Sequence, residues 1–240
     1  MLCLSVCAIR PISLRGCAEM RTTLKRFRAD ESGLTLVEST LIMLVLIYAM
    51  VNLTEFDRYS RFERHLTAAA DSLVAIMGER ANPMQDRDWS DDAGALFWLF
   101  PEAPLLAGSD WRKTLGVQAA LVRFVPSDPS CVSDCASNSA QVVWTWDGGT
   151  AESRALLSAN QVLRACGTLA PGGEAPASTT LPSHLFRAGV MIVVTLAYEY
   201  QPFSSTSVIG QRPLVREAYA VPRAGDQQIT SASNEAQSCP

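Results

Sequence analysis

The longest apolar stretch of the 240-residue chain runs from residue 34 to residue 53, and Glu38 is its one side chain that is charged at neutral pH. As an α-helix, twenty residues extend for about 30 Å, which is the thickness of the hydrocarbon core of a bilayer. The pattern therefore predicts a transmembrane helix over residues 34–53, with a carboxylate near its start.

Beyond this stretch the apolar residues recur at helical spacing. Intervals of three and four residues place them on one stripe, with charged residues around it. Gly78 and the pair Asn82-Pro83 are typical of a helix end. The same helix is therefore predicted to continue, as an amphipathic segment, over residues 54–78. The stripe consists of Tyr59, Phe62, Leu66, Ala69, Leu73 and Ile76.

Two kinds of partner could cover this stripe. It can pack on a domain of the same chain, or on a partner helix in a coiled coil. We favour the first, because the stripe is shorter than three heptads. The residues expected to form the docking stripe are Phe62, Leu66, Leu73 and Ile76.

The rest of the chain changes to a pattern of strands. Runs of β-branched and aromatic residues, bounded by Pro, Gly, Asp and Ser, are typical of strands. Partial alternation in the last two runs favours an antiparallel sheet with one covered face. Helical spacing appears in residues 151–167 at Ala155, Leu156, Val162 and Leu163, and residues 168–183 read as a loop. The predicted strands are 118–126, 141–146, 189–200 and 213–221.

These elements predict an α+β protein. A long N-terminal transmembrane and amphipathic helix precedes a small domain with an antiparallel sheet of about four strands. Residues 1–33 are expected to be a leader, in which residues 1–19 lack the features of a secretory signal, so that Met20 is an alternative start. The domain is expected over residues 79–222 and a polar tail over 223–240.

The distribution of charge predicts the orientation of the helix across the membrane and the kind of partner that the protein can bind. Arg21, Lys25, Arg26 and Arg28 precede the apolar stretch, and such clusters tend to stay in the cytoplasm. The N-terminus is therefore expected to be cytoplasmic and the domain to lie across the membrane. Residues 79–240 hold 11 basic and 16 acidic side chains, which argues against a nucleic-acid partner.

Catalytic patterns are not found. The two histidines, His65 and His184, accompany no nucleophile elbow, no phosphate-binding glycine loop and no H-E-x-x-H motif. We therefore expect no catalytic residues, no enzyme activity and no cofactor.

The cysteines indicate disulfides rather than a metal site. Three of the seven lie in the leader, and an even number in an exported domain is typical of disulfides. The four cysteines allow three pairings, of which we favour Cys131 with Cys135 and Cys166 with Cys239. A zinc site at "CVSDC" is disfavoured by its spacing, and the acidic cluster at residues 86–92 departs from the EF-hand pattern.

Glu38 is the feature that most needs an explanation. A carboxylate at the centre of a membrane helix costs about 2.5 to 3.5 kcal/mol on insertion scales, and less near an end. Gly33 stands five residues before it, at the boundary between the basic leader and the apolar stretch. The order of basic leader, glycine, apolar residues and glutamate resembles the processing site of type IV prepilins.

This resemblance implies cleavage between Gly33 and Leu34 by a prepilin peptidase. It also implies that Glu38 pairs with the new N-terminal amine of a neighbouring subunit. The later segments "VVWTWDGG", "GVMIVVTLAYEYQPF" and "REAYAVPR" are similar to those of the TadE/TadF/TadG group of minor pseudopilins of the tight-adherence (Flp-type) pilus system. Membership would imply a single-pass protein of the bacterial inner membrane with a periplasmic domain.

The partners implied by this resemblance are the prepilin peptidase, other pilins or pseudopilins, and the pilus assembly platform. Two alternatives remain. Ser39, directly after the glutamate, fits a minor pseudopilin of a type II secretion or type IV pilus system slightly better. A membrane-anchored periplasmic binding protein or enzyme, with Glu38 incidental, is the second.

Overall fold

The computed structural model describes residues 31–79, 114–127, 138–148, 150–187, 189–204, 207–223 and 236–239. Several predictions lie outside these residues: the leader before residue 31, the acidic cluster, the pair Cys131 and Cys135, and most of the polar tail.

One helix, α2 (Glu31–Glu79), contains both predicted helical segments in 49 consecutive residues. At 1.5 Å per residue it is about 74 Å long. Contacts divide the chain into two compact units, Met1–Thr54 and Glu55–Pro240, so the second unit begins inside the helix. The sheet domain therefore includes the amphipathic part of α2 as one of its own elements.

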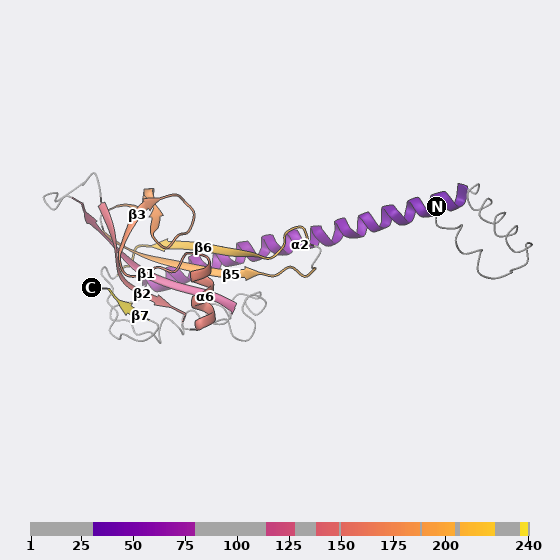
Figure 1. Cartoon of the computed structure of the whole chain (residues 1–240). Coiled ribbons are helices and arrows are strands. Elements are labelled where there is room, and N and C mark those ends of the chain that lie inside the picture. The colour runs from indigo at the N-terminus through magenta and orange to yellow at the C-terminus, as the bar shows by residue number, and fades with distance from the viewer. Residues whose placement is uncertain are drawn as a thin grey trace, which may run out of the picture. The chain divides into compact units, whose positions relative to one another are not determined.

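The second unit is built on one sheet of seven strands, in the order β4-β3-β2-β1-β5-β6, with β7 paired to β2 (Figure 1). All neighbouring strands are antiparallel except β3 and β4, which are parallel. The strands are β1 (Leu115–Pro126), β2 (Asn138–Asp147), β3 (Thr168–Gly172), β4 (Thr180–Pro182), β5 (Gly189–Tyr200), β6 (Arg212–Ala220) and β7 (Ala236–Ser238).

The α+β class is confirmed, and all four predicted strands are present as β1, β2, β5 and β6. The predictions of about four strands and of a purely antiparallel sheet are wrong. Residues 168–183 were expected to form a loop but contain β3 and β4. These strands are five and three residues long in a segment rich in Pro, Gly and Ser, so local propensity does not reveal them. Their pairing is decided by tertiary contacts.

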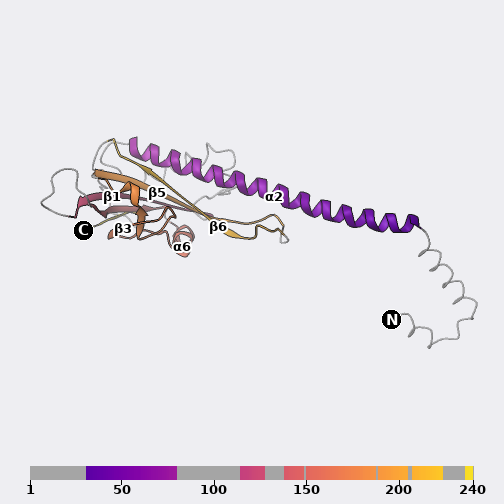
Figure 2. The same cartoon turned by 90° about the horizontal axis from the view of Figure 1, so that it is seen from above.

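The two faces of the sheet are covered by different elements (Figure 2). On one face, Leu115, Val117, Ala119 and Leu121 of β1 form a core with the amphipathic part of α2. On the other face, helix α6 (Ala151–Ala159) contributes Leu157 to a small cluster, and Leu169 of β3 and Leu181 of β4 pack with Val122 in another. Both faces are therefore covered, which the sequence pattern did not predict.

A bulge in β2 explains how its side chains serve both faces. Leu121 pairs with Trp144 and the next residue of β1, Val122, pairs with Val142, so Val143 is an extra residue. Because side chains alternate along a strand, one extra residue reverses the facing of those beyond it. Val142 and Trp144 therefore enter different cores although they stand two residues apart.

Helix α6 is shorter than the helical spacing predicted. Thr150 caps its start, with its side chain accepting a hydrogen bond from the Ser153 amide at 3.1 Å. The helix ends at Ala159, and Gln161 turns the chain with a φ of 56°. Val162 is buried although it lies beyond the end of the helix. Leu157 packs so closely on Gly116 that a Cβ added to this glycine would lie 3.0 Å from the Leu157 side chain.

Candidate functional site: the apolar half of helix α2

The N-terminal half of α2 exposes an apolar surface. In the described helix, twelve large hydrophobic side chains between Val37 and Phe56 are each more than half exposed. The helix is long and apolar enough to cross a membrane, and this part of it is not buried in the protein. It is consistent with a single-pass membrane anchor. The exposed residues are Val37, Leu41, Ile42, Met43, Leu44, Val45, Leu46, Ile47, Tyr48, Met50, Leu53 and Phe56.

The predicted processing motif lies within this helix. The backbone is helical from Glu31 onward, so Gly33, Leu34 and Glu38 share one element. Leu34 and Glu38 are four residues apart, which is about 6 Å along the axis. The Glu38 side chain is exposed. The structure thus places a carboxylate on the apolar surface, about one helical turn after the expected cleavage point.

The predicted docking stripe packs on the sheet of its own chain. Phe62, Leu66 and Leu73 are at most 3% exposed in the core shared with β1, β5 and β6, and Ile76 packs against the same core from a partly buried position. The Phe62 ring stacks on Tyr198 with centroids 5.8 Å apart. This face of α2 is therefore occupied within the domain, which leaves the apolar N-terminal half as the free surface of the helix.

Glu55 joins α2 to the end of β5 at the first residue of the domain. Glu55 is 4% exposed, and the Tyr200 hydroxyl donates a hydrogen bond to its carboxylate. The backbone amide of Phe203 donates to the same oxygen at 3.2 Å. Burial, together with Glu55, raises the pKa of the Tyr200 hydroxyl well above its ordinary value. We did not predict this contact; the only signal was a carboxylate on the helix face that continues the apolar stripe.

A second buried carboxylate, Glu217 of β6, pairs with Arg164 on the α6 side of the sheet. The guanidinium Nη2 lies 2.7 Å from Glu217 Oε1, and the two side chains are 1% and 4% exposed. Arg164 also donates to Thr195 Oγ1 at 2.9 Å and to the Ala177 carbonyl at 2.9 Å. Tyr219 donates to the other Glu217 oxygen at 2.7 Å, and burial raises the pKa of that hydroxyl.

This cluster holds the segment after α6 against the sheet. Gln118 of β1 accepts from the Arg164 amide at 2.7 Å and donates to its carbonyl at 2.8 Å. Arg164 is thus fixed through both its backbone and its side chain. Because the Arg164 and Glu217 side chains are almost fully buried and tie several elements together, we assign the cluster a structural role.

The expected disulfide chemistry is present. Cys166 and Cys239 are joined with a Cα–Cα distance of 5.3 Å, and this is one of the two pairs that we favoured. The Cys239 amide also donates to the carbonyl of Val143, the bulge residue, at 2.8 Å. The tail therefore contains a short strand, β7, that is attached to β2 by hydrogen bonds and to the segment before β3 by a covalent bond.

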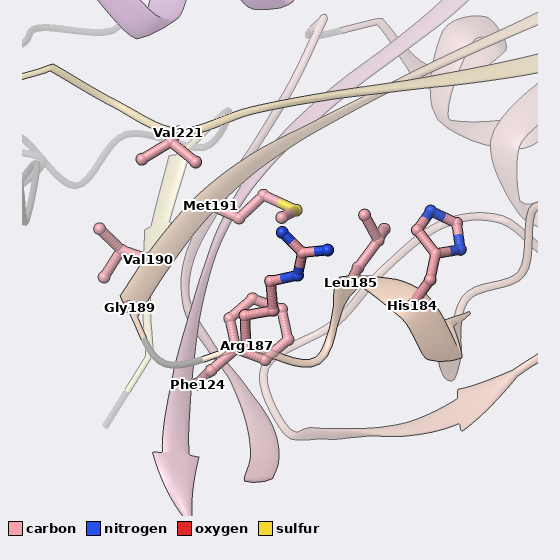
Figure 3. Close-up of a pocket in the computed structure, with 8 residues that line it drawn as sticks. All are labelled: Phe124, His184, Leu185, Arg187, Gly189, Val190, Met191 and Val221. Atoms are coloured by element: carbon pink, nitrogen blue, oxygen red, sulfur yellow. The ribbon is translucent and has the colours of Figure 1, made fainter. Parts of the chain in front are cut away.

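The other sequence candidates do not assemble into a catalytic centre among the described residues. His184 lies at the edge of a pocket of about 350 Å³, with Arg187 between apolar walls that include Phe124, Met191 and Val221 (Figure 3). His184 Nδ1 lies 3.2 Å from a carboxylate oxygen of the exposed Glu174. His65 lies on α2. Within the described part of the chain, no group of three His, Cys, Asp or Glu side chains could hold a metal ion.

Comparison with known proteins adds no family: no family model, no curated protein and no solved structure matches this chain.

Proposed function

We propose that this chain is a bitopic inner-membrane pseudopilin that assists assembly of a tight-adherence (Flp-type) pilus. The observation that supports this function best is Glu38, exposed on the apolar half of a helix whose other half is covered by a sheet domain. In this proposal the chain acts by helix packing and protein–protein contact, and it catalyses no reaction.

The chemistry of the proposal is the pairing of two charges in the membrane. A prepilin peptidase would cut between Gly33 and Leu34 and leave a new amine at Leu34. Each intramembrane charge is unfavourable alone, because the low-dielectric medium solvates it poorly. Glu38 of one subunit and the amine of a neighbour would offset each other, so a subunit with an unpaired Glu38 would favour assembly.

The division of α2 supports the same arrangement. Since Phe62, Leu66 and Leu73 are buried against the domain's own sheet, pilins and the assembly platform would bind the N-terminal half of the helix. The domain would lie in the periplasm, in agreement with the basic residues that precede the helix.

Mass spectrometry of the membrane-inserted protein, from a strain with an active prepilin peptidase, tests the first step. The expected N-terminus is Leu34, and Gly33→Val should retain the leader while Ser32→Ala should not. A leader that remains intact in the unmodified chain would refute processing and with it most of the proposal.

Glu38→Ala tests the second step, with Ser39→Ala as the matched control on the next residue. We expect Glu38→Ala to be inserted and processed but to lose pilus assembly, whereas Ser39→Ala assembles normally. Unchanged assembly in Glu38→Ala would favour the alternative of a membrane-anchored periplasmic binding protein or enzyme, for which the apolar pocket beside Arg187 is the candidate ligand site. Loss of protein secretion instead of pili would favour the type II secretion alternative.

A further inference from the structure

A pocket of about 350 Å³ lies in the sheet domain, beside the pairing of β1 with β5. This volume is near the lower end of the range for pockets that bind small molecules. Hydrophobic side chains form most of its wall, together with Arg187, His184 and Gly189, and none of the described residues that line it is a carboxylate (Figure 3). The hydrophobic residues of the wall are Phe124, Leu185, Val190, Met191 and Val221.

Gly189 contributes open space to this pocket. It pairs with Phe124 where β5 begins, and its φ of 130° lies in a region that only glycine adopts readily. A Cβ added to Gly189 would meet no atom within 4 Å. The pocket therefore has room beside Phe124, at a position where most strand pairs have a second side chain.

The turn that precedes β5 is fixed to the rest of the domain at two points. It begins with the 3₁₀ helix η1 (Ser183–Leu185). The Ser183 hydroxyl donates to the Gly172 carbonyl of β3 at 3.1 Å. The ring of Phe186, which follows η1, packs edge-on against the Phe124 ring of β1 with centroids 5.4 Å apart. The backbone on this side of the pocket is therefore held against two strands.

Arg187 is the next residue, and its side chain extends among the apolar side chains of the pocket (Figure 3). Its amide donates to the Leu185 carbonyl at 2.8 Å and closes an inverse γ-turn at Phe186, where φ is −74° and ψ is 80°. Arg187 is exposed, and its guanidinium makes no hydrogen bond or ion pair with the described residues. A positive charge is therefore available to a ligand that enters the pocket.

The walls and the charge together select the chemistry of a ligand. A guanidinium presents parallel N–H groups that match the two oxygens of a carboxylate, and the hydrophobic wall favours a hydrocarbon group over water. The small volume suits a single short chain. The Glu174 carboxylate, which pairs with His184 at the edge of the pocket, belongs to a side chain that is 80% exposed, so solvent and salt screen its repulsion of a bound anion.

We propose that this pocket binds an amphiphilic carboxylate with a single short hydrocarbon chain. The ligand carboxylate pairs with the Arg187 guanidinium, and the chain packs against Phe124 and Met191 in the space beside Gly189. Every residue of the site belongs to the unit Glu55–Pro240. The site therefore depends neither on the membrane anchor nor on the proposed pilus function.

The test is photo-labelling of the full chain, reconstituted in phosphatidylcholine nanodiscs, with octanoic acid that carries a diazirine at its methyl end. Mass spectrometry of peptides locates the adducts. Octanoate, octanamide and acetate are added in turn as competitors, since octanamide has the chain without the charge and acetate has the charge without the chain. Labelling of the apolar stretch of residues 34–53 by probe dissolved in the lipid serves as the internal reference.

We expect adducts at the pocket, in β1 or β5, that octanoate displaces and that equal concentrations of octanamide or acetate do not. Arg187→Gln should reduce this labelling about tenfold, because it removes a hydrogen-bonding charge, and Arg187→Lys, which keeps the charge, should lose less. The matched control is Arg154→Gln, which removes the same charge from a surface pair with Asp147 and should leave the labelling unchanged.

Equal displacement by octanamide and octanoate overturns the proposal, because the occupant is then chosen by apolar contact alone. An absence of adducts in β1 and β5, or equal labelling of Arg187→Gln and the unmodified chain, also overturns it. Circular dichroism checks that each variant is folded, which the exposure of Arg187 leads us to expect. Cleavage at Gly33 and assembly through Glu38 are measured separately, so this proposal and the proposed function can fail independently.

Discussion

Replacing Arg164 by methionine should destabilise the sheet domain more than any exposed charge substitution. Methionine keeps most of the aliphatic volume but removes the guanidinium, which leaves the 4%-exposed Glu217 carboxylate without its cation and the Thr195 hydroxyl and Ala177 carbonyl without a donor. Removing one member of a buried ion pair costs about 3 to 5 kcal/mol, because the remaining charge is buried alone.

The protein offers a matched control in Arg154, which pairs with Asp147 at 2.8 Å near the protein surface, where the Arg154 side chain is 45% exposed. Surface pairs contribute about 0 to 1 kcal/mol, so Arg154→Met should change the free energy of unfolding by less than about 1 kcal/mol. The two substitutions are chemically identical and differ in the burial of the pair.

Urea unfolding in detergent micelles, followed by the fluorescence of the buried Trp144 and Trp146, measures the difference. With a slope of about 1 to 3 kcal/mol per molar urea, the midpoint should fall by roughly 2 M in Arg164→Met. Adding Glu217→Gln should recover part of the loss, because it removes the isolated charge. Equal midpoints for Arg164→Met and Arg154→Met would refute the assignment of Arg164 as the buried support of the segment after α6.

Three further results are expected from the same domain. Tyr200→Phe removes one of the two donors to the buried Glu55 and should cost about 1.5 to 3 kcal/mol in the urea experiment; an unchanged midpoint would contradict a stabilising role for this contact. Cys166→Ser removes a disulfide that links residues 73 apart, and chain entropy predicts that the free energy of unfolding falls by about 4 kcal/mol. Cys239→Ser should give the same loss, and adding a reductant should not destabilise either variant further, because the disulfide is already absent. Burial raises the pKa of Tyr200 and Tyr219 above 10.0, so above about pH 10 the unfolded chain releases protons that the folded chain keeps, and stability falls as pH rises. Titration of tyrosinate absorbance in the folded protein and in the Tyr200→Phe and Tyr219→Phe variants checks this. The prediction is contradicted if Tyr200 and Tyr219 titrate near pH 10 in the folded protein.

Some elements were predictable because their signals are local. The continuous apolar stretch of residues 34–53, the helical period of the stripe that follows it and the β-branched run of residues 189–200 are local signals, and the structure contains α2 and β5 at these positions. A period reports the face that a helix or strand buries. It does not report what covers that face.

Other elements depend on residues far apart in the chain. Strand β3 pairs with β2 on one side and with β4 on the other, and β7, more than 50 residues further along the chain, also pairs with β2. The bulge at Val143 is set by its pairing with β1 and cannot be read from "QVVWTW". Such pairings follow from register, which local sequence specifies weakly in short strands.

The candidate site divides in the same way. The sequence by itself determined a helix long and apolar enough to cross a membrane, its charged residue Glu38 and the glycine before it, because hydropathy and a linear motif need no partner to be recognised. Only the tertiary structure decided that the stripe of α2 is covered by its own sheet and that Glu55 holds the start of the β5–β6 loop. Glu55 and Phe203 are 148 residues apart, and a contact between such distant residues arises from folding of the whole domain.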